Sequence, residues 1–413
     1  MAVKASLVSI PTLVESPFII ASIGGYTFGS YTGKNSPNAY GSAVKVTYPN
    51  FMESMQITKV NGTVNTYILN FSYQVRAGED PNLLDKIFST ATNDRQIILQ
   101  YGDWNSPGYI YKEEKCIITN ITSNLDMNSS CIKYTLNCTS DAIGLASLSC
   151  NFPARFAKPS DVLKEMLRSR RYGLKEVFTG MLQRDISSLI ASNDKKVQLR
   201  AQNGVTPLAY MNYLVNSMVS YNNTQVTPIQ SSGYYLTIHD DWSTDYGGTY
   251  FKVTEVCANA STKATMDTYE LDVNYPDDNF VSQFSLNNDQ SWAILYEYSQ
   301  KIGAEEYIYR IDDNGHVTTE YVPSLMKSDN NTFSNARSSW WTKMTQFPVQ
   351  ATLTIKGLTR PSILMTYVKL NVWFAGGQKH ISSGLYIITK QVDSISAAGY
   401  KTTLTLLRVG GDS

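Results

Sequence analysis

One pattern occurs twice in this sequence. Residues 383–409 read SGLYIITKQVDSISAAGYKTTLTLLRV, and residues 115–140 read KCIITNITSNLDMNSSCIKYTLNCTS. Each stretch has a run that begins with Ile-Ile-Thr, then a turn region, then a second run with Lys near its start and alternating Thr and Leu. Alternation with a period of two indicates β-strands with one buried face. We therefore predict two similar hairpins, and from them two copies of one β domain.

The residues that carry the repeat are the candidate assembly residues. They are Ile117, Ile118, Thr119, Ile387, Ile388, Thr389, Gly399, Tyr400, Thr402 and Leu404. We expect the repeat to matter for how subunits assemble, because these side chains form no combination that would carry out chemistry. The pattern leaves open which face of each hairpin meets a neighbour.

Length and composition limit the possible classes of protein. A chain of 413 residues that is 42% apolar is expected to form two to four domains with their own cores. Lys and Arg together number 35, as do Asp and Glu, so there is no broad basic field and nucleic-acid binding is not indicated. The longest apolar runs fall short of the roughly 18 residues that a membrane-spanning helix needs, so no membrane insertion is predicted.

The remaining patterns predict a mainly β chain with some α, that is, an α+β multidomain protein. Alternating runs flank Asn61-Gly62, a strong hairpin signal, and apolar residues at helical spacing follow Pro81. Amphipathic patterns predict helices over 158–171, 174–190, 207–221 and 287–303, and a further hairpin over 305–322. The expected domains are an irregular N-terminal arm (1–42), a first β domain (43–150), a helical insert (151–232), an α+β domain (233–340) and a second β domain (341–413).

The strand at 367–374 is predicted to bury one face only. Its two alternating sets are Val368, Leu370, Val372 and Phe374, expected to be buried, and Tyr367, Lys369, Asn371 and Trp373, expected on a polar face.

Catalytic, cofactor and metal sites are not indicated. The three histidines, His239, His316 and His380, lie beside turns or strand ends without a partner at ligand spacing, and no nucleophile, zinc or phosphate-loop motif occurs. Adjacent carboxylates at 240–241, 277–278, 305–306 and 312–313 could suggest glycoside hydrolysis. Most of these pairs lie in turn-like sequence, where solvated carboxylates are the simpler interpretation.

The cysteines and tryptophans have ordinary interpretations too. Cys116, Cys131, Cys138, Cys150 and Cys257 form no C-x-x-C pair, which favours buried reduced thiols, although a disulfide stays open. The tryptophans could stack on sugars, but such side chains more often belong to cores or interfaces.

The C-terminal run resembles a known family. Ser383, Gly384 and Tyr386 at the entry of one strand, and Gly399, Tyr400, Thr402 and Leu404 in the closing strand, are similar to the end of phage baseplate central hub proteins of the late control protein D and T-even tail hub type. The run YPNFMESMQITKVNGTVNTYILNFSYQV (48–75) looks like the first barrel of the same proteins.

The resemblance implies an architecture and a set of partners. Such hubs are homotrimers whose subunits each hold two tube-like β domains, so that three chains form a ring of six domains matching a sixfold tail tube and a threefold spike. The implied partners are further copies of this chain, a tail tube or tube-initiator protein, a central spike protein, a tape measure protein and, as a further candidate, wedge proteins. The implied location is the virion tail, after assembly in the host cytoplasm.

Two other interpretations stay open from the sequence. The chain could be a carbohydrate-binding tail component, or a peptidoglycan-cleaving one that uses carboxylates such as Asp277 or Glu305. The repeat and the lack of a coherent acid–base set favour a structural, non-enzymatic hub.

Overall fold

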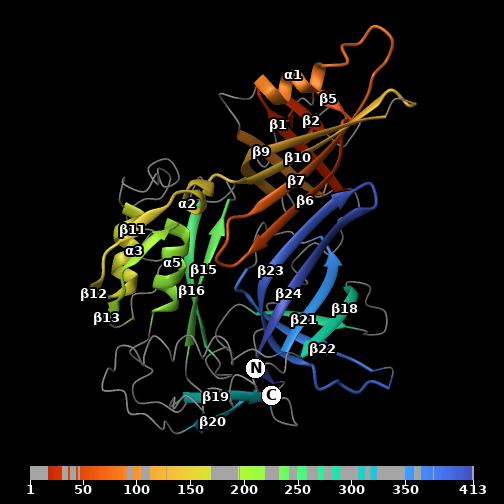
Figure 1. Ribbon diagram of the computed structural model, residues 1–413. Coiled ribbons are helices and arrows are strands. Elements are labelled where there is room, and N and C mark those ends of the chain that lie inside the picture. The colour runs from red at the N-terminus through yellow and green to blue at the C-terminus, as the bar shows by residue number, and fades with distance from the viewer. Residues whose placement is uncertain are drawn as a thin grey trace.

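A computed structural model gives the fold for most of the chain (Figure 1). It describes residues 17–29, 36–37, 43–44, 47–90, 96–103, 112–126, 128–168, 194, 196–218, 232–240, 249–257, 268–273, 281–288, 306–311, 317–322, 349–357, 364–374 and 376–411. Across these residues the protein is mainly β with a few helices, as the sequence predicts.

The first β unit is built around one hairpin and one meander. Its elements are β1 (Pro17–Ile23), β2 (Tyr26–Gly29), β5 (Tyr48–Pro49), β6 (Met52–Val60), β7 (Thr66–Gln74), α1 (Leu83–Thr90), β8 (Gln96–Asp103), β9 (Lys112–Asp126) and β10 (Cys131–Ser140), and the short pair β3 (Ser36–Pro37) and β4 (Ala43–Val44) precedes β5. The hairpin predicted at Asn61-Gly62 joins β6 to β7, and Gly62 has the positive φ of +73° that this turn requires. The helix predicted after Pro81 is α1, whose Leu84, Ile87 and Phe88 pack into the core.

The N-terminal segment is less irregular than predicted. Strand β1 pairs with β8 along its whole length, and Ile19, Ala21 and Ile23 lie in the core of the first unit. The prediction of an arm over 1–42 is therefore wrong for residues 17–29. The run PFIIASI is buried on both faces, so it lacks the alternation that reveals a half-buried strand.

The second β unit draws on more of the chain than residues 341–413. It contains β17 (Thr268–Val273), β18 (Val281–Asn288), β21 (Val349–Lys356), β22 (Tyr367–Val372), β23 (Gly384–Ser396) and β24 (Gly399–Gly411). Strands β17 and β18 thus come from the range that the sequence assigns to a separate α+β domain.

The two units repeat one strand order. The first unit runs β6-β7-β10-β9-β8 and the second runs β18-β21-β24-β23-β22, and every neighbouring pair in both is antiparallel. The next strand differs, because β1 is antiparallel to β8 whereas β17 is parallel to β22.

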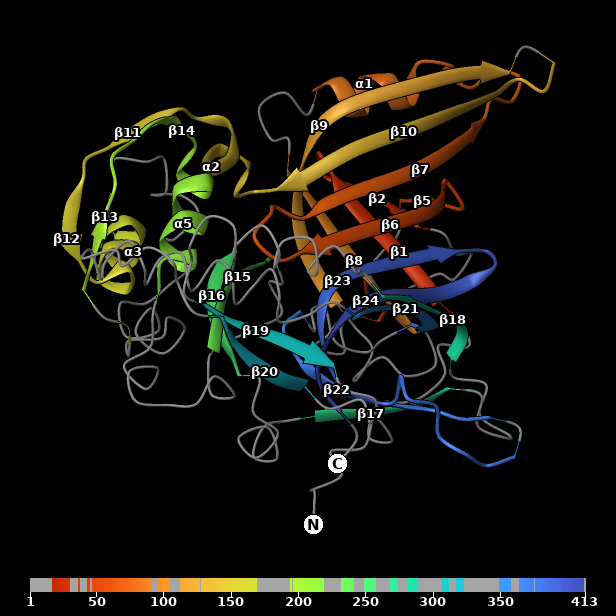
Figure 2. The ribbon, with the colours of Figure 1, turned by 60° about the horizontal axis from the view of Figure 1, so that its bottom comes forward.

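One joint merges both units into a single 14-stranded sheet (Figure 2). The C-terminal half of β23 pairs antiparallel with β6, from Lys390 opposite Val60 to Ser396 opposite Ser54. Ile395 and Tyr400, from the tip of the β23–β24 hairpin, belong to the core of the first unit. The second unit therefore completes the first one by adding a hairpin at its edge.

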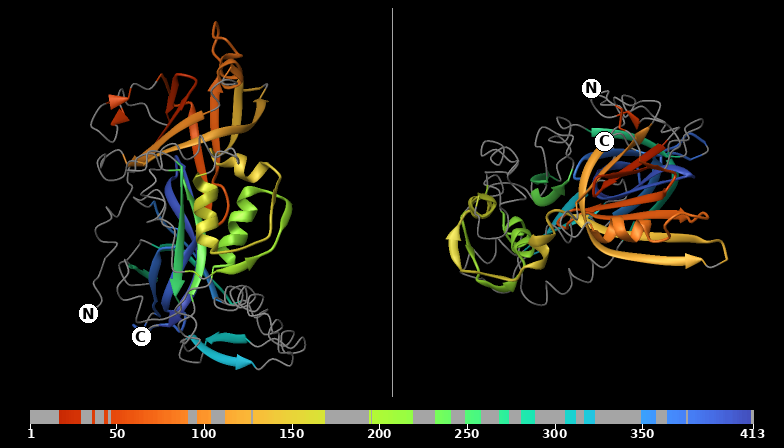
Figure 3. Two further views of the ribbon diagram at one scale, coloured as in Figure 1. Left: turned by 90° about the vertical axis from the view of Figure 1, so that its left-hand side faces the viewer. Right: turned by 90° about the horizontal axis from the view of Figure 1, so that it is seen from above.

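Beside the two units stands a mixed α/β part (Figure 3). Its elements are α2 (Ile143–Ser147), β11 (Cys150–Phe152), β12 (Arg155–Ala157), α3 (Pro159–Arg168), β13 (Val197–Leu199), β14 (Gln202–Val205), α5 (Pro207–Asn216), β15 (Ser232–His239) and β16 (Tyr250–Cys257). Helices α3 and α5 match two predicted helices, but the insert also contains strands that were not predicted. The helices expected at 174–190 and, from 289 on, at 287–303 lie outside the described residues. The hairpin expected over 305–322 is β19 (Glu306–Ile311) with β20 (Val317–Val322).

Strand β22 is buried on both faces, contrary to the one-face prediction. Tyr367 and Asn371 are each 3% exposed, whereas Phe374, expected in the core, is 55% exposed. The reason is a second apolar cluster, in which Tyr235 of β15 and Met365 cover Tyr367 on the side away from the main core.

Candidate functional site

Both Ile-Ile-Thr triplets lie at the same place in the two units and end in the same irregularity. In β9 the pairing with β10 skips Thr119, since Ile118 lies opposite Cys138 and Asn120 opposite Asn137. In β23 the pairing with β24 skips Thr389, since Ile388 lies opposite Leu406 and Lys390 opposite Thr405. Each threonine is thus the extra residue of a β-bulge, a feature that bends a strand and redirects it.

The two bulges also share a hydrogen bond. Thr119 Oγ1 donates to the carbonyl of Asn137 at 2.8 Å, and Thr389 Oγ1 donates to the carbonyl of Thr405 at 3.3 Å. In each case the acceptor is the residue opposite the one that follows the threonine. The sequence repeat therefore encodes a repeated local geometry.

A second bulge repeats on the strand at the other side of each unit. Glu53 is skipped where β6 pairs with β7, and Ser282 is skipped where β18 pairs with β21. The paired residues can be followed across the strands from the residue after each threonine. In the first unit this path ends at Gln56 and in the second at Ser285. Glu53 and Ser282 each lie three residues before that end point, so they occupy equivalent positions. The units therefore correspond residue by residue, with Met55 of β6 equivalent to Phe284 of β18 and Ile57 equivalent to Leu286.

The equivalent strands β9 and β23 differ in what lies beyond the bulge. Before it, β9 pairs with β8 as far as Ile117, and β23 pairs with β22 as far as Ile387. After it, β23 moves on to pair with β6, whereas no strand in the described part of the chain pairs with that edge of β9. The exposures follow: Ile395 is 2% exposed, and its equivalent, Leu125, is 53% exposed.

The remaining candidate residues of the repeat lie inside the joint or the second core. Gly399 starts β24 after the turn with φ +112°. The side chains of Tyr400 and Thr402 both donate to Asp393 Oδ1, at 3.1 and 2.7 Å, while Leu404 is in the second core. Asp393 Oδ2 accepts from Gln391 at 2.8 Å, so the carboxylate at the joint is fully engaged.

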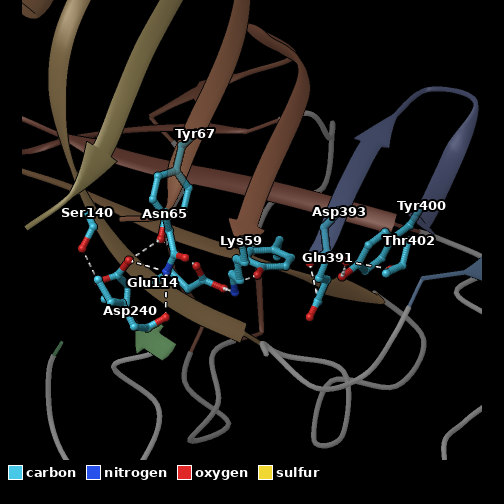
Figure 4. A network of polar contacts seen from close by, with 12 residues as sticks. Lys59, Asn65, Tyr67, Glu114, Ser140, Asp240, Gln391, Asp393, Tyr400 and Thr402 are labelled. Carbon is cyan, nitrogen blue, oxygen red and sulfur yellow. Dashed lines mark hydrogen bonds and ion pairs between the residues drawn. The ribbon is translucent and has the colours of Figure 1, made fainter. Parts of the chain in front are cut away.

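A buried ion pair lies next to this joint, inside the first unit (Figure 4). Lys59 and Glu114 are 1% and 0% exposed, and Lys59 Nζ lies 2.5 Å from Glu114 Oε1. The hydroxyls of Tyr67 and Tyr101 donate to the same carboxylate. Burial, followed by nearby carboxylates, raises the pKa of both tyrosines well above the usual value, so both stay protonated donors.

A buried aspartate from β15's end ties the α/β part to the first unit. Asp240 accepts hydrogen bonds from Asn65 at 2.7 Å, Ser140 at 2.6 Å, Tyr67 at 3.1 Å and Thr249 at 2.8 Å. Burial raises the pKa of Asp240 in spite of these donors. The preceding His239 stacks on Tyr250, and burial, with Lys59 and Lys252 nearby, lowers its pKa to about 3.

These polar clusters suit a structural role. Glu114, Asp240 and Asp393 each accept hydrogen bonds from several side chains, and no group of His, Cys, Asp and Glu in the described residues could hold a metal ion. Of the paired carboxylates, Asp240 is part of this network, whereas Asp241, the pair at 277–278, Glu305 and the pair at 312–313 lie outside the described residues.

The described cysteines form no disulfide: Cys116, Cys131, Cys138 and Cys150 are free thiols. In the described part of the chain, no helix is long and apolar enough to cross a membrane.

Sequence reasoning missed Lys59 and Glu114, and it placed Asp240 in a turn as one of the paired carboxylates. A signal was present for the first two: Lys59 follows Met55 and Ile57 on the inward positions of β6, and Glu114 shares the inward face of β9 with Cys116. A charged residue on a buried face needs a partner of opposite charge, and these two satisfy each other.

Comparison with known proteins concerns the fold. No protein-family model and no curated protein sequence matches the chain. Among solved structures, a tail protein from Neisseria meningitidis MC58 aligns with a TM-score of 0.51 and 10% identity over 95% of this chain and 97% of that chain. The chain has the fold of a tail protein. The 43 kDa tail protein of prophage MuSo2 from Shewanella oneidensis aligns with a TM-score of 0.49 and 11% identity over 95% of this chain and 97% of that one. A type VI secretion component from E. coli, described as similar to T4 bacteriophage tail proteins gp27 and gp5, gives a TM-score of 0.43 and 9% identity over 87% and 75% of the two chains. The tail-protein fold agrees with the resemblance seen in the C-terminal run.

Proposed function

We propose that this protein is a structural component of a phage tail, and specifically a homotrimeric baseplate hub that adapts the sixfold tail tube to the threefold central spike. The observation that carries the proposal is the repeated strand order, with the two units joined edge to edge by β23 and β6. A chain that already places two equivalent units side by side supplies a third of a six-unit ring.

Symmetry supports the same conclusion. Head-to-tail contacts between like units close into a ring when the rotation between neighbours divides a full turn. The partly exposed, threonine-rich face of β21 and β24, which includes Thr354 and Thr403, would line a channel or pack on a neighbour. Partners would be the tube or tube initiator, the spike, the tape measure protein and wedge proteins, in a virion tail assembled in the host cytoplasm.

A mass measurement tests the proposal. Native mass spectrometry or light scattering of the purified chain is expected to give three times the 46.1 kDa of one chain. A monomer at micromolar concentration would contradict the hub. The carbohydrate-binding or peptidoglycan-cleaving alternative predicts instead binding to glycan arrays or release of muropeptides, and no observation in the described residues favours it.

A further inference from the structure

Strand β9 has an exposed outer edge beyond the Thr119 bulge. Residues 119–126 form the half of β9 beyond the Thr119 bulge, and all of them are exposed. The strand leaves β8 at this bulge, so its outer backbone groups have no strand partner among the described residues. Exposed edges with apolar side chains pair readily with another chain, and native proteins normally cover them.

A second open edge belongs to β18, the strand at one end of the sheet. Strand β18 pairs with β21 on one side, and its other side has no strand partner in the described part of the chain. Both edges carry exposed apolar side chains. Leu286 of β18 is 40% exposed, and Ile121 and Leu125 of β9 are 38% and 53% exposed. The equivalent edges, β23 and β6, are the two that pair inside the chain.

We propose that the β9 edge of one chain pairs antiparallel with the β18 edge of a second copy, in the register of the internal β23–β6 joint. This inference rests on the proposed trimeric function and names the contact that closes the ring. Transferring the register residue by residue gives one set of opposed positions: Ile121 with Asn288, Thr122 with Asn287, Ser123 with Leu286, Asn124 with Ser285, Leu125 with Phe284 and Asp126 with Gln283.

The side chains on the two edges fit this register. In the internal joint Ile395 lies opposite Met55 and is buried in the core of the first unit. The same geometry brings Leu125 against Phe284, so an exposed leucine enters the core of the second unit of the next copy. The internal joint carries the buried polar residues Gln391 and Asp393, whereas the positions equivalent to them on β9 are Ile121 and Ser123. The two joints therefore share one backbone register but differ in side chains, polar in the internal joint and more apolar in the joint between copies. Because each edge suits a different partner, first and second units are expected to alternate around the ring.

Disulfide cross-linking tests the register. Asn124 and Ser285 are exposed, and the proposed register puts them directly opposite, within the Cα separation of roughly 4.4–6.8 Å that a disulfide needs. The double variant Asn124→Cys/Ser285→Cys is expected to form covalent dimers and trimers on mild oxidation, reversed by reductant. The matched control is Asn124→Cys/Thr352→Cys: Thr352 is exposed and lies opposite Ser285 on the next strand, which puts it about 10 Å from Asn124 across two strand spacings. No cross-link is expected there.

The single variants control for the native thiols and for a different pairing. A disulfide that joins position 124 of two copies of Asn124→Cys, located by peptide mass spectrometry, would mean that two β9 edges meet each other, and it would overturn the proposal. A second measurement uses Leu125→Asp, which is expected to give folded monomer by circular dichroism and light scattering. The matched control is Leu148→Asp, at a leucine of the α/β part that is 49% exposed, and this variant is expected to remain trimeric. If the wild type is a trimer, Leu125→Asp is also a trimer and the double cysteine variant forms no cross-link, the proposed joint is wrong but the hub is not contradicted. If the wild type is a monomer, the hub itself is contradicted.

Discussion

Thr119 and Thr389 occupy the same position in two copies of one bulge, and each donates its hydroxyl to a carbonyl of the following strand. One strand leaves its first neighbour at this point in both units. In the second unit it then joins β6, which converts two separate sheets into one. The bulge is therefore the local feature on which the edge-to-edge arrangement depends.

Replacing Thr389 by valine removes this hydrogen bond while nearly keeping the shape of the side chain. Thr389 is 9% exposed, so the loss is expected to destabilise the protein by about 1 kcal/mol. Thermal unfolding followed by far-UV circular dichroism measures the effect. Thr352→Val, at an exposed position of β21, is the control and is expected to change stability by less than about 0.5 kcal/mol. Equal shifts in the two variants would show that the bulge hydroxyl has no special role.

Removing Lys59 is expected to be costly, because it leaves Glu114 buried without its positively charged partner. Breaking a buried pair from one side typically costs about 3–5 kcal/mol. Lys59→Met should therefore lower the denaturation midpoint strongly or prevent soluble expression, and Lys59→Met/Glu114→Gln should recover part of the loss. The control is Lys86→Met, which breaks the exposed Lys86–Asp80 pair and is expected to cost less than about 1 kcal/mol.

Acid sensitivity is expected from His239. Its pKa is lowered from 6.5 to about 3 by burial, with Lys59 and Lys252 nearby, so the unfolded chain takes up a proton that the folded chain refuses. The contribution of neutral His239 to the free energy of unfolding is fully present above about pH 6.5 and is lost as pH falls toward about 3. The free energy of unfolding is expected to change by up to about 1.4 kcal/mol per pH unit in this range. Asp240 next to it acts in the opposite sense, since its raised pKa gives stability that is present at low pH and lost as pH rises.

Comparing wild type with His239→Gln isolates the histidine, because Asp240 is common to both. Urea unfolding at several pH values between about 4 and 7 is expected to give a shallower pH dependence for the variant. Parallel curves for the two proteins would contradict a buried neutral His239.

The hairpins and the helix α1 could be predicted from sequence because their signals are local. Asn61-Gly62 marks a turn, and Leu84, Ile87 and Phe88 recur at helical spacing before any tertiary contact is considered. The repeat was visible for the same reason, since the Ile-Ile-Thr triplets are contiguous. That their threonines form bulges could not be predicted, because a bulge is a relation between two strands.

Long-range pairing explains what the sequence did not reveal. Strand β18 pairs with β21, whose first residue, Val349, lies far along the chain, so nothing near residue 281 indicates which domain it joins. Strand β22 looked half-buried because its alternation is regular, but Tyr235 from a distant strand covers the face expected to be polar. Asp240 was assigned to a turn because its donors Asn65 and Ser140 lie far upstream.

Gly357 is expected to tolerate no side chain, because Tyr400 lies directly over it. A Cβ at this position would come within 2.3 Å of the Tyr400 ring. The ring cannot swing away, since its hydroxyl donates to Asp393 and the ring makes a T-shaped contact with Tyr101. Gly357→Ala is therefore expected to cost about 1–3 kcal/mol through overpacking.

The control for this substitution is Gly144→Ala, in helix α2, where a Cβ meets nothing within 4 Å. That change is expected to be neutral or stabilising by up to about 1 kcal/mol. A double-mutant cycle with Tyr400→Ala separates the clash from other effects, because the cost of Gly357→Ala should largely vanish once the ring is gone. If the cost persists without the ring, the strain lies in the backbone between β21 and β24 and not in the contact with Tyr400.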